Sequence, residues 1–154
     1  MKTIYAILLL VFACAPIGGE EALPFSTLSK GYNAPGITGR VEMIFYDENS
    51  FSDAWKKLAP SDASAYASPI AADVDFSREM LILVSPGTCP TGGYDVVIEK
   101  VVDRKSEIEV IVLYKEPRPD EFVTEALTQP YHLITLERRD APARFNWENT
   151  FETQ

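Results

Sequence analysis

The chain has 154 residues, 46% of them hydrophobic, and a formal net charge of -9. This length fits one domain, and it is long enough to bury a core that needs no disulfides. A nucleic-acid-binding surface requires clustered Lys and Arg side chains that displace counterions from phosphates, and the sequence contains no such cluster. The composition therefore indicates an acidic globular protein and excludes a nucleic-acid-binding one.

The N-terminus predicts a signal peptide. One Lys precedes the apolar run Ile4 to Phe12, which is shorter than the roughly 20 residues of a membrane-spanning helix. The sequence VFAC at 11–14 is similar to a bacterial lipobox, so we expect a signal peptide at 1–13 and a lipidated Cys14. Such a lipoprotein is exported and anchored at the cell envelope. Cleavage after Ala15 is the alternative, and it would give a soluble periplasmic or secreted protein.

The next segment, residues 14–36, is expected to be a tether between the lipid and the domain. It is irregular and rich in Gly, Pro and Ser, although Phe25 and Leu28 are candidates to pin it to the core. Cys14 is either lipidated or removed, so Cys89 remains alone in the mature chain. A disulfide framework is therefore excluded.

The first regular elements are a strand and a helix. Residues 40–47 alternate in polarity and contain Phe and Tyr, which is typical of a strand. The helical spacing of Phe51, Ala54, Trp55 and Leu58 follows, and Ser50 with Asp53 forms a weak capping pattern. Pro60 ends this helix, and the small polar residues 61–70 are expected to form a loop.

Four further strands are predicted. The continuous apolar run at 79–85 is typical of a central strand, buried on both faces. Residues 94–102 and 108–114 alternate around a charged turn and form a hairpin, and 131–137 alternates again. No repeated strand–helix–strand units occur, which favours antiparallel pairing. We expect a mainly β domain over 37–140, an antiparallel sheet or small sandwich of about five strands with one short helix; an α+β fold is the alternative.

The C-terminal residues 141–154 are expected to form a polar tail. Phe145 and Trp147 are its two candidates for anchors on the domain.

The stretch GTCPTGGY between two apolar strands is the main candidate site. Pro90 fixes its own φ angle, and Gly92 and Gly93 permit positive φ and close approach of another backbone. A stiff loop loses little entropy on binding, which favours recognition of a protein partner. The alternative is a turn with no binding role. The predicted partner-binding residues are Thr88, Cys89, Pro90, Thr91, Gly92, Gly93 and Tyr94, with the loop 117–122 beside them.

Catalytic and metal-binding interpretations are weaker. A Cys89 nucleophile needs a base, and His132 is the only histidine in the chain, in the middle of a predicted strand. A thiol hydrolase or redox protein using this pair is one alternative function. The oxygens between Asp73 and Glu79 lack the central Gly and the later Glu of a calcium loop. We expect no metal and no cofactor.

Several segments in order resemble a known family. They are VDFSREMLILV, PTGGYDVVIEKV and TQPYHLITLE, preceded by FSDAW. Together they are similar to the C-terminal domain family named after PrcB, a protease-complex subunit, over roughly residues 40–138. The resemblance implies a non-enzymatic, exported or lipid-anchored bacterial protein that stabilises or otherwise modulates a partner protease. A structural envelope lipoprotein without a dedicated site is a further alternative.

Overall fold

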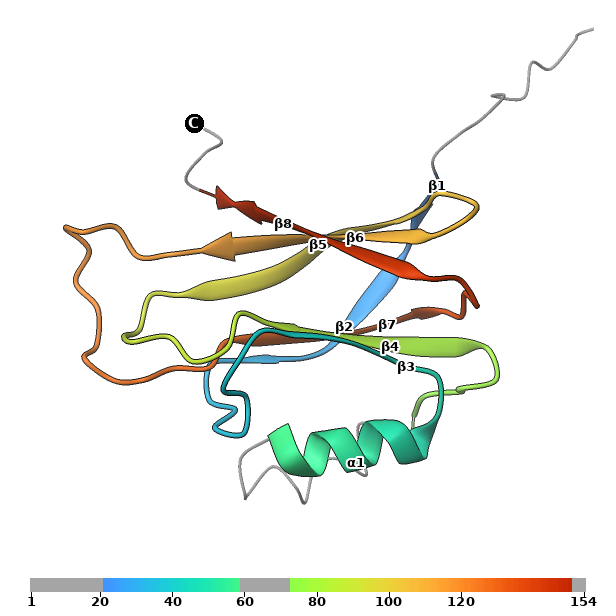
Figure 1. Cartoon of the computed structure of the whole chain (residues 1–154), viewed down its shortest axis with the longest axis horizontal. Coiled ribbons are helices and arrows are strands. Elements are labelled where there is room, and N and C mark those ends of the chain that lie inside the picture. Colours follow the sequence, from blue (N-terminus) through green and yellow to red (C-terminus); the bar gives the residue numbers. More distant parts are fainter. Residues whose placement is uncertain (1–20, 59–72, 151–154) are drawn as a thin grey trace, which may run out of the picture.

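The computed structural model describes residues 21–58 and 73–150, which hold eight strands and one helix (Figure 1). The elements are β1 Glu21–Leu23, β2 Phe25–Gly31, β3 Val41–Phe45, α1 Glu48–Leu58, β4 Glu79–Ser85, β5 Asp95–Asp103, β6 Ile108–Lys115, β7 Tyr131–Glu137 and β8 Ala143–Asn149. The strands form two four-stranded sheets. Sheet A has the order β1-β5-β6-β8, and sheet B has the order β2-β7-β4-β3.

The two sheets pack face to face, and α1 lies against the outer face of sheet B (Figure 1). All neighbouring strands are antiparallel except β6 and β8, which are parallel. The predicted mainly β fold, with mostly antiparallel pairing and one short helix, is therefore confirmed, and the architecture is the sandwich alternative.

Two hydrophobic clusters hold these layers together. The first fills the space between the sheets and includes Ile82, Ile98, Val110 and Ile134. The second lies between sheet B and α1. Strand β4 contributes to both clusters because its successive side chains point to opposite faces of the sheet. The continuous apolar run therefore marks a central strand, as predicted.

Helix α1 forms where it was expected, but a different residue caps it. Asp47 Oδ1 accepts the backbone N–H of Ser50 at 2.8 Å, and Ser50 Oγ donates to Asp47 Oδ2 at 2.8 Å. The predicted cap at Ser50 is therefore wrong by one turn. Phe51 and Trp55 are buried on sheet B, as their spacing indicated. The pKa of the Asp47 carboxyl is lowered, chiefly because the backbone of Ser50 donates to it.

The predicted number of strands, about five, is wrong. Strands β1 and β2 lie in the segment expected to be an irregular tether, and β8 lies in the expected polar tail. The polar and apolar residues of β2 do not alternate regularly, because its pairing with β7 is irregular between Thr27 and Ser29. In β8, Phe145 and Trp147 pack on the core between the sheets, so both predicted anchors are confirmed.

Some sequence predictions fall outside the described residues. They are the signal peptide at 1–13, lipidation of Cys14 and the loop at 61–70. Among the helices that the structure describes, none is long and apolar enough to cross a membrane.

Candidate functional site

Two long connections cross from one sheet to the other at the same end of the sandwich (Figure 1). Residues 86–94 join β4 in sheet B to β5 in sheet A, and residues 116–130 join β6 in sheet A back to β7 in sheet B. We call these two segments the crossing loops. The first contains the predicted binding residues, and the second contains the predicted neighbouring loop.

Backbone hydrogen bonds join the crossing loops. Cys89 N–H donates to the Thr128 carbonyl at 2.7 Å, and Thr128 N–H donates to the Cys89 carbonyl at 3.0 Å. Gly92 N–H donates to the Thr124 carbonyl at 2.9 Å, and Thr128 Oγ1 donates to the Thr91 carbonyl at 2.7 Å. The predicted proximity of the two loops is thus present, and these bonds give the loops a fixed backbone arrangement.

The glycines of the first loop make this close approach possible. A Cβ atom on Gly92 would overlap Thr124 Oγ1. A Cβ atom on Gly93 would lie 2.7 Å from Val123 Cγ1 and 2.9 Å from Pro117 Cβ, and Gly93 has a φ of 85°. Larger residues at either position would therefore separate the loops, and at Gly93 they would also strain the backbone.

The predicted binding residues differ in exposure. Thr88, Pro90 and Gly93 are exposed, Thr91, Gly92 and Tyr94 are partly buried, and Cys89 is buried. The Tyr94 ring stacks on Tyr114 with 6.1 Å between ring centroids. The first loop therefore presents a backbone-rich surface over an aromatic base. It is a connection between two sheets, not the tip of a hairpin.

The crossing loops border a hollow of about 460 Å³. Its lining residues are Tyr32, Gly92, Gly93, Tyr94, Asp95, Lys115, Thr124 and Thr128. Phe122 is fully exposed, and Leu127 and Tyr32 are also exposed large apolar residues. Phe122 ends the loop that was predicted to contribute. Tyr32 and Leu127 were not predicted, because an isolated apolar residue in a loop gives no periodic signal.

The proposed catalytic pair of Cys89 and His132 finds no support in the contacts of His132. Ile98 N–H donates to His132 Nδ1 at 2.9 Å, so the other ring nitrogen, Nε2, carries the proton and donates to Thr27 Oγ1 at 2.8 Å. Burial lowers the pKa of His132 to about 4. Burial also raises the pKa of the Cys89 thiol, the reverse of an activated nucleophile.

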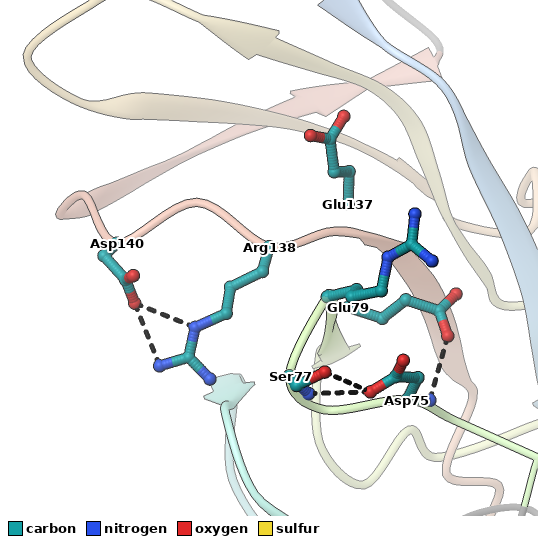
Figure 2. A pocket seen from close by; sticks show the side chains of 7 residues that line it. Asp75, Ser77, Glu79, Glu137, Arg138 and Asp140 are labelled. Atoms are coloured by element: carbon teal, nitrogen blue, oxygen red, sulfur yellow. Dashed lines mark hydrogen bonds and ion pairs between the residues drawn. The ribbon is translucent and has the colours of Figure 1, made fainter.

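A second hollow, of about 720 Å³, lies at the opposite end of β4 and β7 (Figure 2). Its lining is charged: Asp75, Ser77, Arg78, Glu79, Glu137, Arg138 and Asp140. Asp75 Oδ1 accepts from Ser77 N–H at 3.0 Å, so Asp75 caps the turn before β4. Arg138 donates to Asp140 at 3.0 Å and to the Tyr46 carbonyl at 3.1 Å. The polar groups of this hollow therefore largely satisfy one another.

A metal site is not formed in the described ranges. Across residues 21–58 and 73–150, no group of three or more His, Cys, Asp or Glu side chains is placed to hold an ion. The oxygens between Asp73 and Glu79 instead make local turn contacts, since Glu79 Oε2 accepts from Asp75 N–H at 3.0 Å.

Comparison with known proteins gives one result. No curated protein and no solved structure matches the chain significantly. Residues 80–137 match a family model, and this segment runs from β4 to the end of β7. It therefore contains both crossing loops. The resemblance predicted from the sequence is confirmed over this segment: residues 80–137 of the chain match the family described as PrcB C-terminal.

Proposed function

We propose that this protein is a non-enzymatic, protein-binding domain of the bacterial cell envelope and that it stabilises or modulates a partner protease. The binding surface is the exposed side of the crossing loops. The observation that carries the proposal is a fully exposed Phe122 on a loop whose neighbours are held by backbone hydrogen bonds. The family match over 80–137 supports a role associated with a protease complex.

The exposed apolar residues support binding of a protein. A large aromatic side chain in water contributes nothing to the core of its own domain, yet it supplies much of the contact energy when a partner covers it. Phe122 and Leu127 lie in the second crossing loop, and Tyr32 directly follows β2. Gln129 N–H of the second loop donates to the Tyr32 carbonyl at 2.8 Å and fixes the backbone there. Because that backbone is already ordered, binding costs less conformational entropy.

The charge of the second loop indicates the chemistry of the partner. Residues 116–130 carry four acidic side chains and one basic one, and Lys115 ends β6 directly before them. Lys115 pairs with Glu121 at 3.4 Å, and Arg118 lies 3.8 Å from Asp120, so both basic groups have an acidic neighbour within the loop. The remaining negative charge favours a partner surface that combines a basic rim with an apolar pocket.

The location at the envelope rests on the N-terminal sequence. The lipobox-like sequence ending at Cys14 supports a lipid anchor there. Release of labelled fatty acid from the wild-type chain, and its absence after Cys14→Ser, would test the anchor separately from the binding surface.

The decisive experiment compares two exposed apolar residues of the second crossing loop with one exposed apolar residue elsewhere. The full chain carrying Phe122→Ser and Leu127→Ser is used for affinity capture from native membranes, beside a control chain carrying Met43→Ser. Met43 is also an exposed large apolar residue, but it lies on β3. The loop variant should lose a stoichiometric exported protease or its complex, while the control retains it.

Equal recovery by the two variants would reject the loops as the binding surface. Absence of any stoichiometric partner with the wild-type chain would favour the purely structural envelope protein. Circular dichroism of both variants should match the wild type, since neither change touches a buried side chain.

A further inference from the structure

The outer face of sheet A differs from that of sheet B, because α1 covers only sheet B (Figure 1). Among the described residues, no helix or strand lies over the outer face of sheet A. The inward side chains of β8, such as Phe145 and Trp147, pack on the core, so Arg144, Asn146 and Glu148 point outward. These three side chains are exposed.

The registers of the neighbouring strands place an apolar centre on this face. Ile111 lies opposite Asn146, and Leu113 lies opposite Glu148. On the other side of β6, Val97 lies opposite Leu113. Ile111, Leu113 and Val97 are only partly buried. The outer face of sheet A thus has the apolar centre that a packed sheet requires, together with a charged margin.

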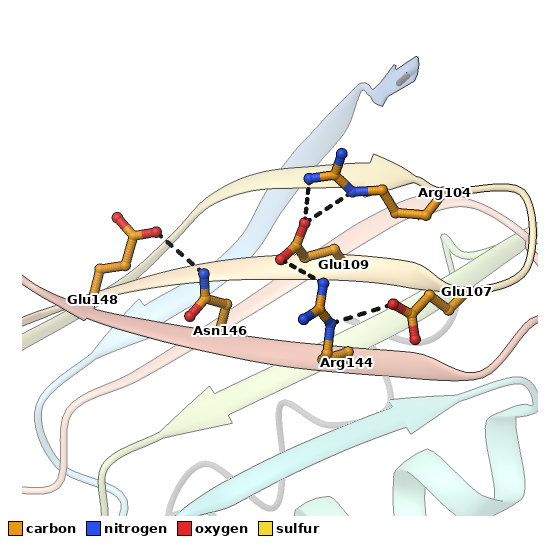
Figure 3. A network of polar contacts seen from close by, with 6 residues as sticks. All are labelled: Arg104, Glu107, Glu109, Arg144, Asn146 and Glu148. Atoms are coloured by element: carbon orange, nitrogen blue, oxygen red, sulfur yellow. Dashed lines mark hydrogen bonds and ion pairs between the residues drawn. The ribbon is translucent and has the colours of Figure 1, made fainter. Parts of the chain in front are cut away.

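The charges on the margin change sign along the strands. Strand β8 has the cation Arg144 at one end, neutral Asn146 in the middle and the anion Glu148 at the other end. Arg144 donates to Glu109 at 3.0 Å, and Glu148 accepts from Asn146 at 3.3 Å (Figure 3). These contacts hold the side chains outward on the same face, and the Arg144 side chain remains 59% exposed.

We propose that this face binds a second copy of the chain, with a twofold axis that crosses the strands at the level of Asn146 and Ile111. The axis reverses the strand direction of the second copy. Arg144 of each copy then lies opposite Glu148 of the other, and Ile111 and Asn146 each face their own counterparts. A C2 interface must be self-complementary in this way.

Charge complementarity is what favours a second copy as the occupant. The protein has a formal net charge of -9, so most of its surface would repel another copy. The face itself is neutral: its basic residues are Lys100, Arg104, Lys115 and Arg144, and its acidic residues are Glu99, Glu107, Glu109 and Glu148. Lys100 on β5 pairs with Ile111 on β6, so it lies at the level of the proposed axis but two strands away from β8. It is exposed, as is its neighbour Glu99.

A charge exchange tests this arrangement. In Arg144→Glu, both ends of the outward side of β8 are acidic. In Glu148→Arg, both ends are basic. Each single variant of the full chain, purified in mild detergent, should sediment as a monomer at concentrations where the wild type doubles its mass. An equimolar mixture of the two should form a heterodimer, because each acidic position then faces a basic one. The double variant should recover the wild-type mass.

A second measurement does not depend on these ion pairs. A residue on the twofold axis faces its own counterpart across sheets that pack about 10 Å apart, so a short bismaleimide should join Asn146→Cys of one copy to that of the other in native membranes. Met43→Cys, on the other sheet, is the control and should stay monomeric on a denaturing gel.

Three results would overturn the proposal. The first is a wild type that remains monomeric at every concentration tested. The second is dimerisation of the single charge variants as strong as that of the wild type. The third is no more cross-linked product from Asn146→Cys than from Met43→Cys. Thermal melts of Arg144→Glu are needed in each case, because this change also removes the contacts of Arg144 with Glu107 and Glu109.

Discussion

The two ends of the sandwich differ in how their side chains are satisfied. At one end, the hollow of about 720 Å³ is lined by Asp75, Glu79, Arg138 and other charged residues that largely bond to one another and to nearby carbonyls. At the other end, the hollow of about 460 Å³ lies beside exposed Phe122, Leu127 and Tyr32. The larger hollow therefore has most of its polar groups paired within the chain, whereas the smaller one lies beside apolar side chains that no described part of the chain covers.

This difference shows why the size of a hollow is a poor guide to function here. Interface energy comes mainly from a few apolar or aromatic side chains that become fully buried on binding. Ion pairs that are already made within a chain must be broken or kept exposed when a partner arrives, and exposed pairs contribute little. The crossing loops thus have the more suitable chemistry for binding a protein.

The largest expected effect lies at the base of the crossing loops, where His132 is buried and neutral. Its pKa is lowered from 6.5 to about 4, so the unfolded chain binds a proton that the folded chain does not between these two pH values. This contribution to stability is complete above pH 6.5 and is lost as the pH falls toward 4, and it amounts to about 3 kcal/mol. Urea unfolding of the wild type and of His132→Gln should therefore converge as the pH decreases. A constant difference between pH 7 and pH 4 would contradict this.

A large kinetic effect is expected for Cys89, which lies in the same end of the molecule. Its side chain is buried and burial raises its pKa, so alkylation must await local opening of the loops. Iodoacetamide should modify the folded protein at least about 100-fold more slowly than the protein in urea. Cys14 is replaced by Ser to leave one reactive thiol. Fast modification of the folded chain would restore the thiol-enzyme alternative.

An intermediate effect is expected when the crossing loops are forced apart. Gly93→Ala places a Cβ atom against Val123 and Pro117 at a φ of 85°, and it should lower the free energy of unfolding by about 1–3 kcal/mol. Gly39→Ala is the matched control, because nothing lies within 4 Å of a Cβ atom there. Urea denaturation measures both. Equal small changes would mean that the loops are not closely packed at Gly93.

The smallest effects are expected for two arginines, Arg138 at the charged end and Arg118 in the second crossing loop. Arg138→Lys keeps the charge but loses the forked contacts with the carbonyls of Tyr46 and Phe76 and with Asp140. We expect a loss of about 1 kcal/mol in unfolding free energy and no change in partner binding. Arg118→Lys, in an exposed pair with Asp120, should change stability by less than about 0.5 kcal/mol. Loss of partner binding by Arg138→Lys would contradict the account, because it would place the binding surface at the charged end of the sandwich.

The sequence alone predicted the elements whose local residue pattern is set directly by packing. The run at 79–85 and the spacing of Phe51 and Trp55 predicted a central strand and a helix, because burial on one or both faces sets those patterns. Strand β2 was missed since its polar residues lie at a sheet edge with irregular pairing. Strand β8 was missed although Phe145 and Trp147 alternate with polar residues, because its position beside β6 depends on a parallel contact between distant segments.

The site was predicted in part for a similar reason. The glycines of GTCPTGGY indicated close backbone contact, and the structure shows which residues make it, namely Val123, Thr124 and Pro117. Their spatial proximity arises because both connections cross between the sheets at one end, which no local pattern encodes. The exposure of Phe122 likewise depends on the course of the whole loop.

The most direct test of the proposed binding surface is a hydrogen-exchange footprint of the full chain with its captured partner. Amides in residues 86–94 and 116–130 should exchange more slowly in the complex than in the free protein, while residues 73–79 and 137–140 should be unchanged. Slower exchange confined to the charged end, with none in the crossing loops, would contradict the account.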